Sequence, residues 1–316
     1  MQLSQIFTAA WILAPHGSGP MLDCHAMNRP STACLLVAVL LAVAGCSLQD
    51  APLVGKPAAT MDGHTISMSD YQARLKVEQD LYKTSKTASQ EQDIAIRSLV
   101  DEVLIDDEAA RKNLSVSDDD VNKAIDFQRN SYNQAATLQK IQNPTQPAPP
   151  DFNTFLRNEG YDIDKLRESV KHILLEQKVE HRMAQNRADS ALRALQSGTA
   201  ITDVAKQYSD LASASSGGVE SIDSSHLASG DPRLQPALNT LQPGDTSKSV
   251  VAGVNGFYLF KLLTRDEAGI TANIVFISAP DPNLYTPKFR PQWFADFVKG
   301  LEDNAHVKYN VGSKAG

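Results

Sequence analysis

The sequence predicts an α+β protein in which a helical region comes first, short strands follow, and one more helix lies near the end. Between residues 88 and 180, apolar residues recur at the spacing of one helix face. Between residues 217 and 278, Gly and Pro separate short runs that are rich in β-branched and aromatic residues. A chain of 316 residues has room for two domains of ordinary size.

The composition excludes several classes of protein. The chain has 37 acidic and 30 basic residues and a formal net charge of -7, so it lacks the basic surface that general nucleic-acid binding requires. Cys24, Cys34 and Cys46 are its three cysteines, so the rest of the chain can form no disulfide and no thiolate metal site. No Walker-type phosphate loop, His-Glu-x-x-His motif or Gly-x-Ser-x-Gly elbow occurs. We therefore expect no metal, no nucleotide and no other cofactor.

The N-terminus is predicted to be a signal peptide, residues 1–45. Its apolar run over residues 35–45 is too short to span a bilayer and suits the core of a signal peptide. Arg29 is the only basic residue upstream of this run. Met27 opens a compact signal peptide, so translation could begin there, and Met21 is a further possible start.

The signal peptide ends on Val43-Ala44-Gly45-Cys46, which resembles the lipobox of bacterial lipoproteins. The resemblance implies cleavage before Cys46 and lipidation of its sulfur, and two or more acyl chains make a lasting membrane anchor. Ser47, in place of Asp, favours the outer membrane facing the periplasm over the inner membrane. The alternative is an ordinary secretory signal that happens to contain a cysteine. Either way, the compartment is extracytoplasmic.

The elements of the first half follow in order after a tether over residues 46–58. A hairpin with an Asp62-Gly63 turn leads into a helix that we expect Ser69 to cap. A helix spans about 88–111, and Ser117 with three aspartates begins another. The later elements are a Pro-rich break over 142–150, a short helix over 152–158 and a long helix capped by Asp164.

The second half begins with an Ala- and Leu-rich helix pair over residues 187–208, divided at Gly198. The predicted strands cover residues 249–251, 257–262 and 274–277, and a last helix over 293–301 precedes a closing strand over 307–311.

Taken together, these segments resemble the SurA/PrsA-type periplasmic foldases. The motifs that carry the resemblance are Asp62-Gly63-x-x-Ile66-Ser67, Leu99 to Ile105 with Glu108-Ala109, Val116 to Val121, Leu166 to Lys178, and Trp293 to Val307. The resemblance implies an α-helical SurA-N-like chaperone domain built from both chain ends, with an inserted, degenerate parvulin-like α+β domain. The implied boundaries are 59–184 for the chaperone domain, 185–268 for the parvulin-like domain, 269–290 for a connector, and 291–312 for the returning helix and strand.

The parvulin-like segment also shows its family's motifs in order. They are Asp203 to Asp210, the pair Gly217-Gly218, Leu241 to Ser247, and Val250 with Gly256 to Lys261. Parvulins lower the barrier of about 18–20 kcal/mol to X-Pro rotation in a small apolar pocket around two histidines and an Asp or Cys.

Here most of the parvulin site positions are substituted. The second histidine is Tyr258, the Asp or Cys falls at or near Leu211, and a pocket aromatic falls on Leu234. The first histidine could be His181, although the family's His-Ile-Leu-Val strand is missing before Gly198. The resemblance thus nominates His181 and Tyr258 as catalytic, and Leu211, Leu234, Phe257 and Phe260 as substrate-binding.

We expect a lipid-anchored extracytoplasmic folding factor that binds unfolded exported polypeptides without ATP and whose isomerase activity is weak or absent. Its partners would be those polypeptides and, through Cys46, the membrane. Two alternatives stay open: an active peptidyl-prolyl cis-trans isomerase, and a structural lipoprotein subunit of an envelope assembly. Candidate linings of a client groove, each of which could equally be core, are Met61, Met68, Tyr71, Leu75, Phe127, Tyr132, Phe152 and Phe155.

Overall fold

The structure is a computed structural model, and it describes residues 55–82, 86–158, 162–279, 281–282 and 290–313. The predicted signal peptide, its lipidation residue Cys46 and most of the tether lie outside these residues. The α+β class predicted from the sequence is confirmed.

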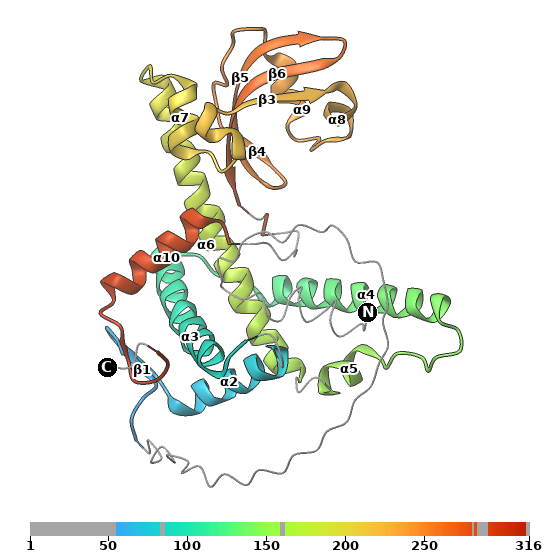
Figure 1. The fold of residues 1–316 in the computed structure, drawn as a ribbon, viewed down its shortest axis with the longest axis vertical. Helices are drawn as coiled ribbons and strands as arrows, with labels where there is room; N and C mark the ends of the chain where they lie inside the picture. The colour runs from blue at the N-terminus through green and yellow to red at the C-terminus, as the bar shows by residue number, and fades with distance from the viewer. Residues whose placement is uncertain (1–54, 83–85, 159–161, 280, 283–289, 314–316) are drawn as a thin grey trace, which may run out of the picture.

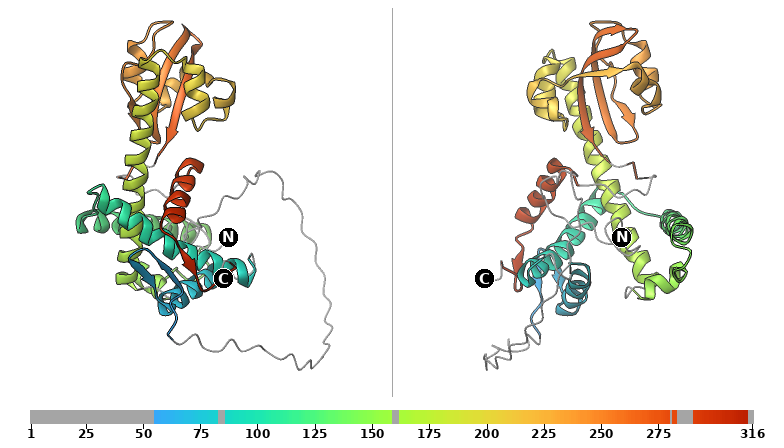
Figure 2. Two further views of the ribbon diagram at one scale, coloured as in Figure 1. Left: turned by 90° about the vertical axis from the view of Figure 1, so that its left-hand side faces the viewer. Right: turned by 45° about the vertical axis from the view of Figure 1, so that its right-hand side comes forward.

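Two bodies lie along one long helix, α6 (Ile163–Gln196), as Figures 1 and 2 show. We call the described residues of 55–178 and 290–313 the helical body, and residues 187–279 the sheet unit. At 1.5 Å per residue, the 34 residues of α6 span about 51 Å, so one helix reaches from one body into the other. The N-cap of α6 is Asp162 rather than Asp164, because the Asp162 carboxylate accepts the Lys165 amide at 2.8 Å. The boundary expected at 184/185 falls inside α6, with no break in the helix.

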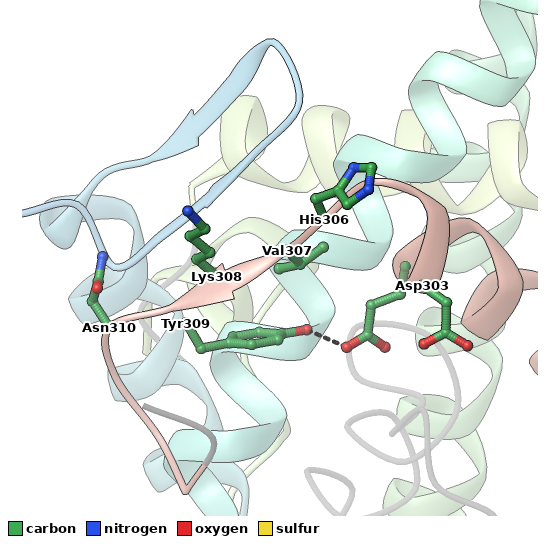
Figure 3. Close-up of a pocket in the computed structure, with 7 residues that line it drawn as sticks. Asp303, His306, Val307, Lys308, Tyr309 and Asn310 are labelled. Carbon is green, nitrogen blue, oxygen red and sulfur yellow. Dashed lines mark hydrogen bonds between the residues drawn. The ribbon is translucent and has the colours of Figure 1, made fainter. Parts of the chain in front are cut away.

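The two ends of the described chain share one sheet in the helical body. Strand β1 (Ala59–Met61) pairs antiparallel with β2 (His64–Ile66) on one side and with β7 (Lys308–Tyr309) on the other. Tyr309 donates its hydroxyl to Glu302 Oε1 at 2.7 Å, which ties β7 to the helix before it (Figure 3). The closing strand is therefore present, and it is shorter than the predicted 307–311.

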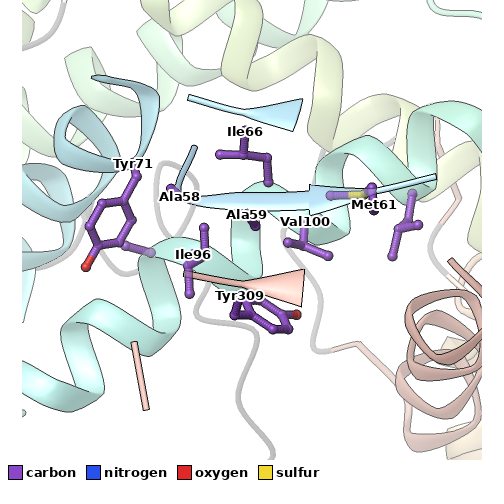
Figure 4. Close-up of a cluster of buried hydrophobic side chains, with 10 residues drawn as sticks. Ala58, Ala59, Met61, Ile66, Tyr71, Ile96, Val100 and Tyr309 are labelled. Atoms are coloured by element: carbon purple, nitrogen blue, oxygen red, sulfur yellow. The ribbon is translucent and has the colours of Figure 1, made fainter. Parts of the chain in front are cut away.

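The core of the helical body lies between this sheet and helices α2 (Met68–Tyr82) and α3 (Ala88–Arg111), as Figure 4 shows. Ser67, rather than Ser69, caps α2, because the Ser67 hydroxyl accepts the Asp70 amide at 3.1 Å. The bounds predicted for α3 are correct, and Thr87 and Gln90 form a capping box at its start. The largest members of the core are Met61, Ile66, Tyr71, Ile96, Leu104 and Tyr309.

Helices α4 (Asp118–Gln142) and α5 (Phe152–Asn158) form an arm that projects from the helical body (Figure 1). Ser117 caps α4 as predicted, in a capping box with Asp120. Tyr132 is buried where the two helices meet, and it packs on the Phe152 and Phe155 rings at 5.7 and 4.8 Å. The Pro-rich stretch ends α4, because proline cannot continue a helix.

The sheet unit contains a four-stranded antiparallel sheet of order β3-β6-β5-β4. Its strands are β3 (Val219–Asp223), β4 (Val251–Gly253), β5 (Gly256–Asp266) and β6 (Gly269–Ser278). Its helices are α7 (Ile201–Tyr208), the 3-10 turn η2 (Ala212–Ser216), α8 (Ser224–Ser229) and α9 (Gln235–Thr240). The expectation that residues 269–290 form a connector is wrong for its first ten residues, because β6 is an inner strand that pairs with both β3 and β5.

Helix α10 (Gln292–Asn304) returns the chain to the helical body. Just before it, Arg290 donates through Nη1 to Asp101 Oδ2 at 2.8 Å and through Nε to Glu176 Oε1 at 2.9 Å. The Arg290 guanidinium also lies 5.6 Å from the centre of the Phe294 ring. One largely buried arginine thus joins the start of α10 to α3 and α6.

Candidate functional site

The predicted site residues of the sheet unit divide between two faces of strand β5. Successive side chains of a strand point to opposite faces of the sheet. Phe257 and Leu259 therefore face α6 and α7, where they pack with Ala184, Ala188 and Val204. Tyr258 and Phe260 face α8 and α9.

Four of the predicted residues gather on the α8 and α9 face. Leu211, Leu234 and Tyr258 pack against the buried cluster that contains Phe260. Tyr258 lies opposite Phe276 in the β5–β6 register, with ring centroids 4.8 Å apart, and it stacks on Phe260 at 5.8 Å. These four residues are therefore neighbours on this face.

Gly253 shows how closely this neighbourhood is packed. A Cβ atom placed on Gly253 would lie 2.7 Å from Tyr258 Cε2, 2.7 Å from Asp231 Oδ2 and 3.2 Å from Leu234 Cδ2. The Asp231 carboxylate also accepts the Val254 amide, which holds the loop after β4 against this corner. The side chains of Tyr258, Asp231 and Leu234 therefore fill the space over Gly253.

Tyr258 is poorly suited to act as a general acid or base at neutral pH. Burial raises the pKa of its hydroxyl to about 12, and the nearby Asp231 carboxylate adds to the rise. A general acid or base works best when its pKa lies near the operating pH. The Tyr258 hydroxyl therefore stays protonated and is limited to hydrogen bonding.

The other predicted catalytic residue lies on the opposite face of the sheet. His181 is a half-buried residue of α6, and its ring contacts Phe257 with centroids 4.9 Å apart. The structure therefore does not bring His181 and Tyr258 together. It separates Phe257 from Leu211, Leu234 and Phe260 in the same way.

A polar cluster that the sequence analysis missed lies where the two bodies meet. Asp210 Oδ2 accepts the Ser278 amide at 2.7 Å, and Arg187 of α6 approaches the same carboxylate at 3.9 Å. The Arg187 guanidinium donates to the Tyr208 carbonyl at 2.9 Å and lies 5.8 Å from the centre of the Trp293 ring. Trp293 packs against the buried cluster that contains Phe294 and Val298 of α10, and also against the cluster that contains Phe257 of the sheet unit. The group formed by Asp210, Arg187 and Trp293 therefore joins the two bodies.

The same cluster contains an unusual carboxylate. Burial raises the pKa of Asp210, and the Ser278 amide, the Arg187 guanidinium and the Trp293 indole oppose that rise. The Tyr208-Ser209-Asp210 motif was a sequence signal for part of this cluster, but nothing in the sequence pairs it with Trp293. Because the Asp210 carboxylate contacts Ser278 of β6, Arg187 of α6 and Trp293 of α10, the cluster has a structural role at the junction of the two bodies.

A separate open hollow of about 610 Å³ lies between the end of α10 and β7 (Figure 3). Its walls are Glu302, Asp303, His306, Val307, Lys308, Tyr309 and Asn310. His306 Nδ1 lies 3.0 Å from Asp62 Oδ2, so this histidine links the two ends of the described chain. None of the predicted site residues that the structure describes lines the hollow.

The apolar surface of the arm offers a second kind of site. On α4, Phe127, Leu138 and Ile141 are 41%, 57% and 69% exposed. Of the eight candidate linings, only Phe127 is exposed, Met68 and Leu75 are partly buried, and the other five are core residues.

Within the described residues, no group of three or more His, Cys, Asp or Glu side chains could hold a metal ion. None of the helices in these residues is both long and apolar enough to cross a membrane.

Comparisons with known proteins match both bodies. The family described as the SurA-like N-terminal domain matches residues 31–180, and the family described as the PPIC-type PPIASE domain matches residues 156–266. Among solved structures, the chain is similar to the foldase protein PrsA from Streptococcus pneumoniae, with 12% identity and a TM-score of 0.23. That match covers 78% of this chain and 86% of the other. No curated protein matches the chain. Strand β6 lies beyond the PPIC-type match, yet it completes the sheet.

Proposed function

We propose that this chain, which matches the SurA-like N-terminal domain and then the PPIC-type domain along its length, is an extracytoplasmic folding factor. It binds unfolded exported polypeptides transiently and without ATP. The observation that carries the proposal is the order of the two matched domains along one chain. The arm supports it, because α4 presents exposed apolar side chains of the kind that hold unfolded segments.

In this proposal the PPIC-type domain is weak or inactive as an isomerase. A proline site needs an open apolar pocket beside polar groups that stabilise the twisted bond. Here Gly253, Tyr258 and Leu234 are closely packed, and the face of β5 that carries Tyr258 is not the face near His181. The domain would serve as a binding module.

The domain organisation belongs to the same proposal. The helical body is a chaperone domain built from both chain ends, as the β1–β7 pairing supports, and the parvulin-like domain is inserted in it. The inserted domain extends through residue 278, because β6 is part of its sheet. Cys46 is the lipid-anchored residue, and the outer membrane facing the periplasm is the membrane that Ser47 favours.

The test is suppression of aggregation. An unfolded outer-membrane protein is diluted from urea, and light scattering is followed with and without the full chain, in the absence of ATP. We expect scattering to fall severalfold at about equimolar chain. The variant Leu138→Ser/Ile141→Ser should suppress less, since it removes two exposed apolar side chains and leaves the core intact.

A matched control is Leu263→Ser, which removes an exposed apolar side chain from β5 of the sheet unit instead and should suppress aggregation as the unaltered chain does. If the unaltered, folded chain leaves scattering unchanged, the proposal is wrong. A structural lipoprotein of an envelope assembly would then be the better account.

A further inference from the structure

Strand β3 forms an exposed outer edge of the sheet in the sheet unit. It pairs with β6 on one side, and it is the last strand in the sheet order. Val219, Ser221 and Asp223 are exposed, and Val219 keeps 45% of its surface accessible. The opposite edge, β4, differs: it has three residues, and Asp231 covers the loop that follows it by accepting the Val254 amide.

The register shows which backbone groups of β3 point outward. Ile274 N donates to Gly218 O at 2.7 Å, and Ser224 N donates to Ala268 O at 2.9 Å. In an antiparallel ladder, hydrogen-bonded pairs alternate along the strand. The backbone groups of Glu220 and Ile222 therefore face β6, and those of Val219, Ser221 and Asp223 face away.

Most of these outward groups have no hydrogen-bond partner among the residues that the structure describes. The Asp223 carbonyl lies at the N-cap of α8, where it is available to the first turn of that helix. Five outward groups remain to be assigned a partner: the amides of Val219, Ser221 and Asp223, and the carbonyls of Val219 and Ser221. Within the described residues, none of these five groups takes part in a backbone hydrogen bond outside the strand ladders. Three donors and two acceptors thus lie in a row along an exposed edge.

Such a row matches the backbone of an extended chain, which can add to a sheet edge as a new strand. The exposed side chains of β3 further limit the kind of chain that would fit this edge. Val219 offers an apolar contact. The Asp223 carboxylate accepts the His226 amide at the start of α8 and pairs with the His226 ring, and its side chain, which remains 56% exposed, favours a basic residue nearby. An unfolded polypeptide is the partner that presents unpaired backbone and alternating side chains together.

We propose that the outer edge of β3 binds an extended segment of an unfolded polypeptide as a fifth strand of the sheet. This inference rests on the proposed function and states how the sheet unit holds a client. The site needs no proline in the client. It also lies apart from the Tyr258 neighbourhood, because Ile222 points toward that face and the exposed residues of β3 point to the other.

The test compares Ser221→Pro with Ser221→Ala. Proline removes the outward amide of residue 221 and leaves the inward ladder bonds of its neighbours, and an outward position of an edge strand tolerates proline. Both variants lose the contact between the Ser221 and Thr271 hydroxyls, which lie 3.2 Å apart, so they differ chiefly in the backbone amide and the ring of proline. The probe is a fluorescein-labelled peptide of twelve residues that alternates Val, Thr and Lys.

We expect Ser221→Pro to weaken binding of this peptide by about fivefold or more, while Ser221→Ala binds like the unaltered chain. Equal binding by a folded Ser221→Pro variant would overturn the proposal. If that variant unfolds, hydrogen exchange of the unaltered chain, measured with and without the peptide, decides whether β3 binds it. The peptide should slow exchange at residues 219–223, and unchanged exchange there would overturn the proposal.

The aggregation test separates this inference from the proposed function. If the unaltered chain suppresses aggregation but neither binds the peptide nor protects β3, the edge-strand site is wrong and the folding-factor function stands. If it also fails to suppress aggregation, the proposed function fails as well.

Discussion

Replacing Arg290 with Met is expected to destabilise the helical body by about 3–5 kcal/mol. Arg290 is 13% exposed, and its two carboxylate partners, Asp101 and Glu176, are 14% and 21% exposed. Methionine fills similar space but carries no charge, so two largely buried carboxylates would lose the guanidinium between them. Removing one member of a buried ion pair is costly because the remaining charge stays in a poorly solvated place. The measurement is urea unfolding of the full chain, followed by far-UV circular dichroism.

The control for Arg290 is the triple variant Arg290→Met/Asp101→Asn/Glu176→Gln. It removes all three charges together, and replacing a whole buried ion cluster by neutral groups is often close to neutral. We expect it to regain most of the stability lost by Arg290→Met. A loss below about 0.5 kcal/mol for the single variant would mean that these contacts do not hold α10 in place.

Stability of the helical body should fall as the pH rises from 5 to 8, by about 2 kcal/mol through Glu78 alone. Glu78 lies on α2 and is only 4% exposed. Burial raises its pKa from 4.5 to about 7; Arg74 and Lys86 oppose this rise, and Glu102 and Glu91 add to it. Because the folded state holds the proton more tightly, the stabilisation is complete below the unfolded pKa and is lost as the pH rises through about 7.

The variant Glu78→Gln should remove this dependence. It mimics the protonated side chain, so its unfolding free energy should match that of the unaltered chain at pH 5 and exceed it at pH 8. Glu267→Gln, at an exposed position of the sheet unit, serves as the control and should leave the pH profile unchanged. Parallel profiles for Glu78→Gln and the unaltered chain would show that Glu78 does not titrate in this range.

Local signals in the sequence predicted most helices but not their continuity. The bounds of α3 follow from its apolar spacing and its capping box, which are both local features. The two helices expected on either side of residue 184 are one helix, because no residue there breaks the pattern. The short helices α8 and α9 have six residues each, too few to show a helical period.

Long-range pairing explains the remaining errors in the fold. The apolar residues 274–277 predicted a strand correctly, but its place between β3 and β5 depends on partners far apart in the chain. The connector was expected over 269–290, which includes the same residues, because the parvulin-like motifs in the sequence end at Lys261. A sequence pattern alone does not state which strands pair.

Only the part of the candidate site that lies on the α8 and α9 face of β5 could be predicted from the sequence. The resemblance assigned six residues to one site, and four of them, Leu211, Leu234, Tyr258 and Phe260, are neighbours in the structure. The other two, His181 and Phe257, lie on the opposite face of β5. Spacing along the sequence could not show whether His181 and Tyr258 lie together, because the side of α6 that meets β5 depends on three-dimensional packing. The Asp210, Arg187 and Trp293 cluster was missed for the same reason.

The most direct test of the whole account is exchange NMR on a proline-containing peptide that also has apolar residues, with and without the folded full chain. The uncatalysed cis–trans exchange takes tens of seconds or more, so catalysis is easily seen. The account predicts that the peptide signals broaden on binding while the exchange rate stays at its uncatalysed value. Exchange well above that rate, reduced by Tyr258→Phe or His181→Ala in a folded chain, would contradict it and show an active isomerase.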